Sequence, residues 1–247
     1  MSARRVFRIA GDDREDFLQN LVTNDVAGLK DGLVWAALLS PQGKYLADFF
    51  LVPDGEAILL DVAEPLAAGL MQRLSMYKLR AKVTIEPTDI SVARGIGDAP
   101  TGTFADPRHP SLGWRAYDGR TDQTADWDAL RVKAGVPESG IELIPNETYP
   151  LEAGFERLHG VDFKKGCYVG QEVTARMKHK TELRKGLRRV RVRGTADVGS
   201  ELTSEDGKLA GTLFTQADGE GLAYLRFDRA LGEMRAGEAV VRVADDP

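Results

Sequence analysis

Apolar residues recur at helical spacing in three stretches of the chain, residues 12–22, 65–77 and 124–134. The first stretch begins with aspartates that suit a helix N-cap, the second opens on Pro65, and the third is stopped by Gly135. Each stretch is therefore predicted to form a helix with one apolar face.

Strand patterns occupy much of the remaining N-terminal part. Residues 33–39, 45–52, 56–62 and 82–86 form short apolar runs, and turns that contain Pro and Gly separate the first three. The order strand, strand, strand, helix, strand predicts an α+β unit with mainly antiparallel pairing. Residues 98–120 are rich in Gly, Pro and Asp and are expected to connect elements, with one short strand among them.

The pattern changes after Arg184 to short strands separated by Gly or Asp turns. The strand candidates are residues 186–194, 208–216, 221–228 and 238–244. This spacing predicts a small antiparallel β-barrel. We therefore expect an α+β region over residues 1–184 and a C-terminal β-barrel over residues 185–247.

The composition is that of a globular protein without a membrane segment. The chain has 247 residues, 43% of them hydrophobic, which is enough to fill one large core or two modest ones. Its longest apolar runs fall far short of a membrane span, and its N-terminal residues lack the apolar core of a signal peptide. A cytoplasmic protein without a membrane partner is expected by default.

Positive charge is concentrated between Arg176 and Arg193, although the net charge of the chain is −5. This basic segment holds nine Lys or Arg residues and one acid, Glu182. Because Val190 and Val192 alternate with arginines, a half-buried strand with a solvated outer face explains part of the charge. The alternative is a patch that weakly binds tRNA or another anion.

The segment with the most distinctive chemistry is residues 164–176, KKGCYVGQEVTAR, which holds the single cysteine, Cys167. Gly166 and Gly170 leave the backbone near the sulfur uncovered, so a ligand or partner can approach it. Neighbouring lysines, Arg176 and a helix predicted to begin near Gly170 favour the thiolate. Cys167 is therefore a candidate nucleophile, ligand or redox sensor, and the alternative is a small buried residue in a turn.

A single cysteine also excludes an intramolecular disulfide and any zinc or iron-sulfur site built from several cysteines of one chain. If the protein takes part in cluster chemistry, a partner or a second copy must supply the other cysteine ligands.

The cysteine segment resembles the signature of the YgfZ family of folate-binding proteins, relatives of the aminomethyltransferase (T-protein) of the glycine cleavage system. The signature residues are Lys165, Gly166, Cys167, Tyr168, Gly170, Gln171, Glu172 and Arg176. Further segments resemble the family in order and spacing: 17–26, 40–52, 77–85, 130–138 and 150–168. This chain has Thr181-Glu182 where relatives often have a glycine.

The resemblance implies a three-lobed α+β body, with two interleaved lobes around a central channel and the barrel behind them. It also implies a protein that supports the assembly or repair of iron-sulfur clusters, especially four-iron clusters, and the enzymes that depend on them, tRNA-modifying enzymes included. The implied cofactor is tetrahydrofolate or a one-carbon derivative. The implied partners are iron-sulfur proteins or cluster-assembly factors.

The resemblance also implies a folate site. Asp48 matches an aspartate near the reactive nitrogens of folate, where a carboxylate can accept a hydrogen bond or shuttle a proton. Arg131 matches an arginine whose planar fork suits a pterin carbonyl or a carboxylate. Lys78 and Arg80 are candidates for the glutamate tail, and Glu152 for the pterin amino groups.

Each of these residues also has a structural alternative. Asp48 can be a cap or an outward strand residue, Arg131 an exposed helix residue, and Glu152 the cap of a short helix at 151–158. Three functions are therefore weighed. In the leading one, an iron-sulfur accessory factor uses Cys167 to contact a cluster, a one-carbon unit or a partner thiol. The others are a one-carbon transferase that uses Asp48 and a tRNA-binding module, and whether any reaction is catalysed stays open.

Overall fold

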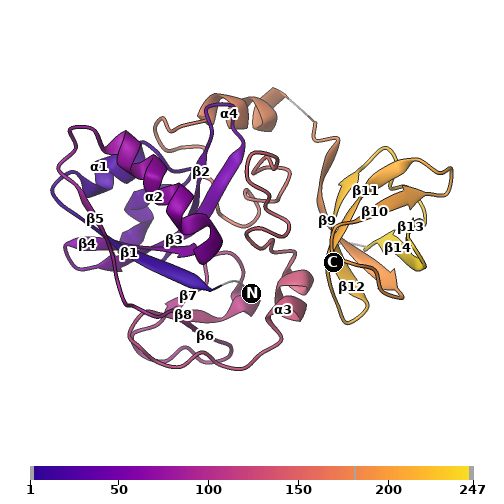
Figure 1. Cartoon of the computed structure of the whole chain (residues 1–247), viewed down its shortest axis with the longest axis horizontal. Coiled ribbons are helices and arrows are strands. Elements are labelled where there is room, and N and C mark those ends of the chain that lie inside the picture. Colours follow the sequence, from indigo (N-terminus) through magenta and orange to yellow (C-terminus); the bar gives the residue numbers. More distant parts are fainter. Residues whose placement is uncertain (1–2, 181, 245–247) are drawn as a thin grey trace.

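A five-stranded antiparallel sheet forms the centre of the larger body in this computed structural model, which describes residues 3–180 and 182–244 (Figure 1). Its strand order is β2-β3-β4-β1-β5. The strands are β1 (Arg4–Ala10), β2 (Val34–Leu39), β3 (Tyr45–Asp54), β4 (Ala57–Ala63) and β5 (Thr84–Pro87).

The two faces of this sheet pack against different layers. Helices α1 (Arg14–Gln19) and α2 (Glu64–Lys78) share one hydrophobic cluster with side chains such as Phe49 and Leu51 of β3. Phe50 and other side chains on the opposite face of the sheet belong to a second hydrophobic cluster, which also contains residues from irregular segments. Alternate residues of one strand point to opposite faces, so β3 contributes to both cores.

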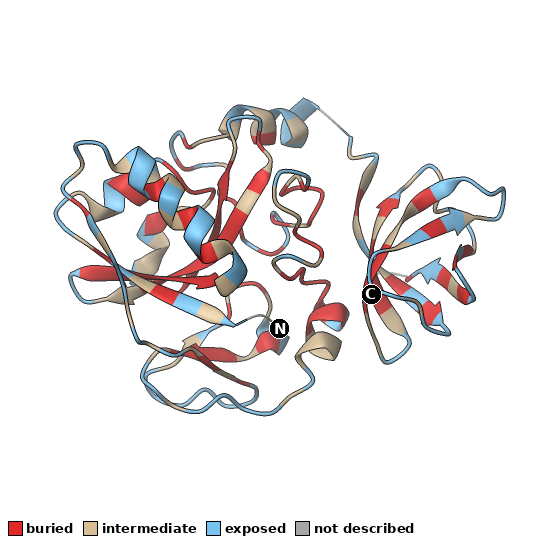
Figure 2. Cartoon of the chain, in the orientation of Figure 1, coloured by how far each residue is buried: buried red, intermediate tan, exposed pale blue. Residues whose placement is uncertain are grey.

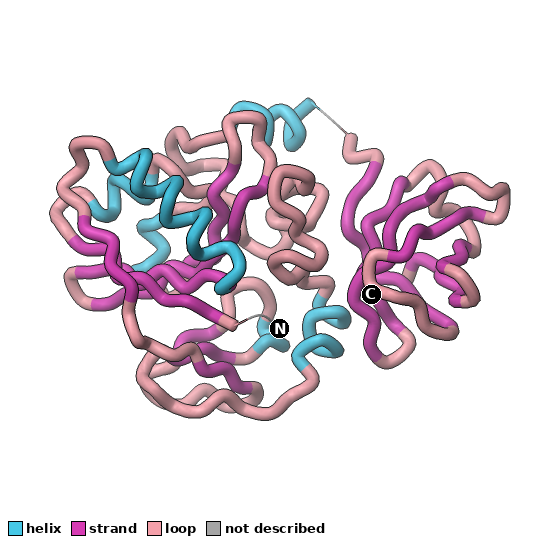
Figure 3. The backbone as a smooth tube through the Cα atoms, viewed as in Figure 1, coloured by secondary structure: helices cyan, strands magenta, loops and turns pink. Residues whose placement is uncertain are grey.

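A smaller sheet and a long irregular segment cover the second face. The sheet has the order β6-β8-β7, and α3 follows it after a loop. The elements are β6 (Ala93–Gly95), β7 (Phe104–Ala105), β8 (Trp114–Ala116), α3 (Trp127–Ala134) and α4 (Gln171–Lys180), with short 3-10 turns at Val26–Lys30 and Pro110–Leu112. Figure 3 shows that the chain between α3 and α4 is almost entirely loop.

The C-terminal strands close into a barrel with the order β10-β11-β12-β9-β14-β13. They are β9 (Lys185–Arg193), β10 (Ser200–Ser204), β11 (Leu209–Ala217), β12 (Glu220–Arg226), β13 (Met234–Ala236) and β14 (Ala239–Val243). Val190 and Val192 are buried while Arg191 and Arg193 are exposed, which confirms the half-buried strand predicted from their alternation. Figure 2 shows buried and exposed stretches alternating along the strands of the barrel.

The α+β class, the antiparallel pairing and the small barrel are confirmed, and five strands escaped prediction: β1, β6, β7, β10 and β13. In β1, Arg4, Arg5 and Arg8 interrupt the apolar pattern, but each is paired with an acid, which belongs to β4, α2 and β3 respectively. Strands β10 and β13 are too short and polar to stand out, and β6 and β7 have only three and two residues.

The prediction of a helix at 151–158 is wrong, because that stretch forms successive turns instead. Gly154 in this stretch has a positive φ of 80°, a backbone conformation outside the α-helical region. Glu152 therefore caps no helix there. Thr181, part of the pair noted in the sequence, lies outside the described residues.

Candidate functional site

Cys167 is exposed on the loop that leads into α4. The reading of this cysteine as a small buried residue is therefore wrong. The side chains of Lys165 and Tyr168 on either side of it are buried, whereas Gly166 is exposed beside the thiol. The chain thus presents the sulfur from a short exposed stretch between two inward-facing residues.

Lys165 points its ammonium group away from solvent into a group of backbone carbonyls. Its Nζ donates to the carbonyl oxygens of Gln19 at 2.7 Å, Val22 at 2.6 Å and Asn24 at 2.9 Å. Burial lowers the pKa of Lys165 to about 8, against the opposing effect of the carboxylates of Asp25 and Asp162. The sequence suggested that this lysine promotes the thiolate, but the structure gives it backbone partners.

The loop is also fixed by its own backbone. The amide of Asp162 donates to the carbonyl of Thr23 at 3.0 Å. The carboxylate of Asp162 in turn accepts from the amides of Lys164 and Lys165 at 2.5 and 3.2 Å. Residues 162–165 are therefore tied to the turn that follows α1.

Helix α4 begins directly after Gly170, as predicted, and sits on the hairpin between β2 and β3. Gly170 has a φ of 84°, and a Cβ there would lie 2.7 Å from the carbonyl oxygen of Ser40. A Cβ on Gly43 would in turn lie 2.8 Å from the Cβ of Val173 in α4. Both glycines thus permit a close approach of two backbones that a larger residue would prevent.

The remaining signature residues have mainly local contacts. Gln171 donates weakly to the carbonyl of Gly166 at 3.4 Å, and Arg176 pairs with Glu172 at 2.8 Å one turn earlier in α4. The ring of Tyr168 packs in the hydrophobic cluster on the second face of the sheet, and burial raises the pKa of its hydroxyl.

Asp48 is buried on the second face of the sheet, which excludes an outward strand residue. One carboxylate oxygen accepts from Tyr45 Oη at 2.7 Å and Ser139 Oγ at 2.6 Å, and the other from Trp35 Nε1 at 2.9 Å. Burial and the neighbouring carboxylate raise the pKa of Tyr45 well above its ordinary value. Three donors of the protein thus already occupy the proposed folate acceptor.

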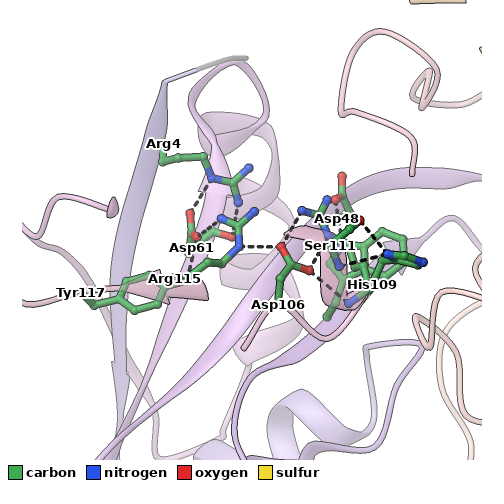
Figure 4. A network of polar contacts seen from close by, with 10 residues as sticks. Arg4, Asp48, Asp61, Asp106, His109, Ser111, Arg115 and Tyr117 are labelled. Atoms are coloured by element: carbon green, nitrogen blue, oxygen red, sulfur yellow. Dashed lines mark hydrogen bonds and ion pairs between the residues drawn. The ribbon is translucent and has the colours of Figure 1, made fainter. Parts of the chain in front are cut away.

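A second buried network runs beside Asp48, and few features of the sequence pointed to it (Figure 4). Asp61 accepts from Arg4 at 2.6 Å, from Tyr117 at 2.9 Å and from Arg115 at 3.5 Å. Arg115 also donates to Asp106 at 3.1 Å. The only hint was the spacing of Asp, Arg and Tyr in a segment interpreted as a connection.

Arg131 is buried, so the exposed-helix alternative is wrong. Its guanidinium pairs with Asp128 and Glu142, both at 2.8 Å, and donates to Thr215 of the barrel. The sequence missed Glu142, which accepts from both Arg131 and Thr215. Arg131 therefore links the body to the barrel.

Glu152 serves the same junction. Its carboxylate accepts from Tyr224 Oη of β12 at 2.5 Å, and its backbone carbonyl accepts from the amide of Leu187 of β9 at 2.7 Å. Lys78 and Arg80 lie at the end of α2, the helix on the opposite face of the central sheet from Asp48. The structure therefore does not gather the predicted folate residues into one site.

Little open space remains next to Arg131 in this structure. The cavity lined by Arg94, Arg108, Arg115 and Arg131 has a volume of about 10 Å³, which holds about one water molecule. Ligand pockets for molecules of folate size measure about 300 Å³ or more. The centre is filled by the protein's own ion pairs and aromatic rings, such as Phe50 beneath Arg115.

The basic segment is largely paired with acids. Arg189 contacts Glu220 at 3.1 Å, Arg193 contacts Glu233 at 3.0 Å, and Lys178 contacts Glu156. Pairing of this kind reduces the positive field that a phosphate backbone would require.

Within residues 3–180 and 182–244, none of the helices has the length and apolarity to cross a bilayer.

Comparison with known proteins finds relatives over most of the chain. The mouse protein "Iron-sulfur cluster assembly factor IBA57, mitochondrial" is 30% identical over 95% of this chain and 78% of its own length. Its human counterpart is 29% identical over 96% and 80%. A homologue from the fungus Mycosarcoma maydis is 34% identical over 74% of this chain, but only 54% of its own length.

The same comparisons support the two structural parts. Residues 184–246 match the family profile described as the CAF17 C-terminal beta-barrel domain. The glycine cleavage system aminomethyltransferase T from Bartonella henselae superposes with a TM-score of 0.77 over 99% of this chain and 83% of its own, at 15% sequence identity. The expected aminomethyltransferase-like fold is thus confirmed. The relatives carry the name IBA57 rather than YgfZ, and their names place them in mitochondria, so a cytoplasmic location stays a prediction.

Proposed function

Because the chain belongs to the family of iron-sulfur cluster assembly factors IBA57, we propose that it assists cluster assembly by presenting Cys167 to a cluster held by a partner. The observation that carries this proposal is the exposed thiol, held between two buried anchors on a loop tied to the body. Such a thiol can meet a second protein without any opening of the fold.

The chemistry asked of Cys167 is that of one ligand among several. A thiolate binds iron through sulfur, and clusters are commonly held by four such ligands. This chain has one cysteine, so a carrier or client protein would supply the others. A single thiolate suits a shared cluster that is later released, because only the bond between iron and the sulfur of Cys167 has to break on the side of this protein. Four-iron proteins are the expected clients.

Tetrahydrofolate has no role in this proposal, because the side chains of Asp48 and Arg131 are already hydrogen-bonded within the protein and the cavity that Arg131 lines is small. For the same reason, this proposal assigns no one-carbon transfer to Asp48. We therefore expect no saturable tetrahydrofolate binding in calorimetry with the purified protein. Stoichiometric binding that Asp48→Ala abolishes would contradict this part and revive the folate site.

The role of Cys167 is tested in cells that lack the gene and depend on it for a four-iron enzyme. Wild type should restore the activity of that enzyme, whereas Cys167→Ser should leave it near the level of the empty cells. Ser is close in size to Cys, and the residue is exposed, so the unfolding free energy should change by less than about 0.5 kcal/mol.

Lys164→Ala provides the matched control. Lys164 is exposed, lies three residues before Cys167 and also belongs to the loop. This variant should support the enzyme like wild type, because it leaves the thiol in place. Full activity of Cys167→Ser at equal protein level would refute the proposed role of the thiol.

A further inference from the structure

We propose that Lys165 acts as a tethered cation whose ammonium group holds the loop of Cys167 in its presenting position. This inference rests on the proposed function only in so far as that function makes the position of Cys167 matter. The position of the loop itself can be measured without any assembly assay. It makes Lys165 a positioning residue and not a ligand of the cluster.

The three carbonyl groups around the ammonium need a donor. They belong to Gln19, Val22 and Asn24, at the end of α1 and in the turn after it. The last carbonyls of a helix have no partner within it, and a lysine can satisfy them. An ammonium has three N–H donors, so its capacity equals the number of carbonyl oxygens that surround it.

The anchor acts at one end of a very short exposed stretch. Lys165 is buried at one end and Tyr168 at the other, with only Gly166 and Cys167 between them. Tyr168 is held by hydrophobic packing, and the ammonium lies 5.3 Å from the centre of its ring. Removing the charge would free one end of the stretch and leave three carbonyls, one buried and two part-buried, without this donor.

A neutral side chain of similar length cannot replace this function. Lys165→Met keeps the bulk of the side chain and lacks any donor, whereas Lys164→Met removes an equal charge from an exposed neighbour. The pair therefore separates the contact with the carbonyls from the general effect of positive charge near the thiol.

The single cysteine allows a direct measurement, because a nitroxide spin label reacts only at Cys167. The labelled Lys165→Met variant should show a more mobile electron paramagnetic resonance spectrum than wild type, and labelled Lys164→Met should not. Amide exchange of Asp162, which donates to Thr23, should accelerate at least about tenfold in Lys165→Met.

Chemical rescue distinguishes a cation site from ordinary packing. Lys165→Ala lacks a group of the size of n-propylammonium. In the wild-type protein, a surface hollow of about 400 Å³ is already lined by Asn24, Asp25 and Asp162, next to the contacts of Lys165. Adding n-propylammonium should return the mobile spectrum toward that of wild type, and n-propanol should not. If Lys165→Met does not fold, the yield of folded Lys165→Ala in n-propylammonium against n-propanol replaces the comparison.

Three results would overturn the inference: an unchanged spectrum in Lys165→Met, equal loosening in Lys164→Met, or equal effects of the amine and the alcohol. A loosened loop together with full enzyme support by Cys167→Ser would instead uphold the inference and refute the proposed function. The two failures are therefore distinguishable.

Discussion

Asp106 and Asp118 each lie two residues before an arginine that bonds to both carboxylate oxygens, but only the pair at Asp106 is buried. Burial alone would raise the pKa of Asp106, yet Arg108 and Arg115 hold it far below its ordinary range. The same local sequence spacing thus has different consequences in two environments.

We predict that Asp106→Asn lowers the unfolding free energy at neutral pH by about 3–5 kcal/mol, because it leaves the buried guanidinium of Arg108 without its carboxylate and that of Arg115 with only the longer contact to Asp61. Asp118→Asn should cost less than about 1 kcal/mol, since its pair with Arg120 faces solvent. Urea denaturation of both variants checks this. Equal losses would show that burial of the network does not govern its contribution.

The pH dependence has a defined sign. The folded-state pKa of Asp106 is depressed, so its stabilising contribution is present above the ordinary value of 3.8 and is lost as pH falls below it. The unfolding free energy of wild type should therefore fall below about pH 4, with a slope of up to about 1.4 kcal/mol per pH unit from this group. Asp106→Asn should show a shallower decline over the same range, and an identical decline would contradict the assignment.

At the scale of elements, α4 and the β2–β3 hairpin meet through glycines. Gly170→Ala would place a methyl group against the carbonyl of Ser40 at a residue with positive φ. We expect a loss of about 2 kcal/mol or more in unfolding free energy. Gly166→Ala is the matched control, because a Cβ there meets nothing within 4 Å. If Gly170→Ala unfolds at the same temperature as wild type, α4 does not approach the β2–β3 hairpin as closely as described.

The sequence predicted most of the elements in which apolar residues recur with a single period, that of a helix or of a strand. Helix α3 and strands β2 to β4 followed their apolar patterns and turn residues. Strand β1 did not, because its three arginines interrupt the apolar pattern, and the acids that pair with them, Asp54, Asp61 and Glu64, are brought beside them only by the fold. The turns at 151–158 resembled a helix because composition does not reveal a positive φ at Gly154.

The site was predictable only in part for the same reason. Cys167 stood out by its neighbours in sequence, and its exposure supports that reading. The partners of Asp48 and Arg131 come from distant segments, such as Ser139 and Thr215, and no local pattern announces them. Resemblance placed these residues in the centre but could not tell a ligand site from a closed network.

For the whole molecule, the barrel is joined to the body through Glu142 and Thr215. Glu142 accepts from the hydroxyl of Thr215 at 2.7 Å while it pairs with Arg131. A double-mutant cycle of Glu142→Gln and Thr215→Val should give a coupling energy of about 1–2 kcal/mol. The exposed pair of Arg193 and Glu233 within the barrel should give less than about 0.5 kcal/mol. If the losses of unfolding free energy from Glu142→Gln and Thr215→Val are simply additive in urea denaturation, this contact does not couple the barrel to the body.

The central claim is that the thiol of Cys167 meets a cluster carried by another protein, and its accessibility reports this directly. The purified protein is treated with iodoacetamide under anaerobic conditions, alone, with a cluster-loaded carrier and with the same carrier without cluster. We predict that only the loaded carrier protects Cys167 from alkylation, as measured by mass spectrometry. Equal alkylation with loaded and empty carrier would contradict the account.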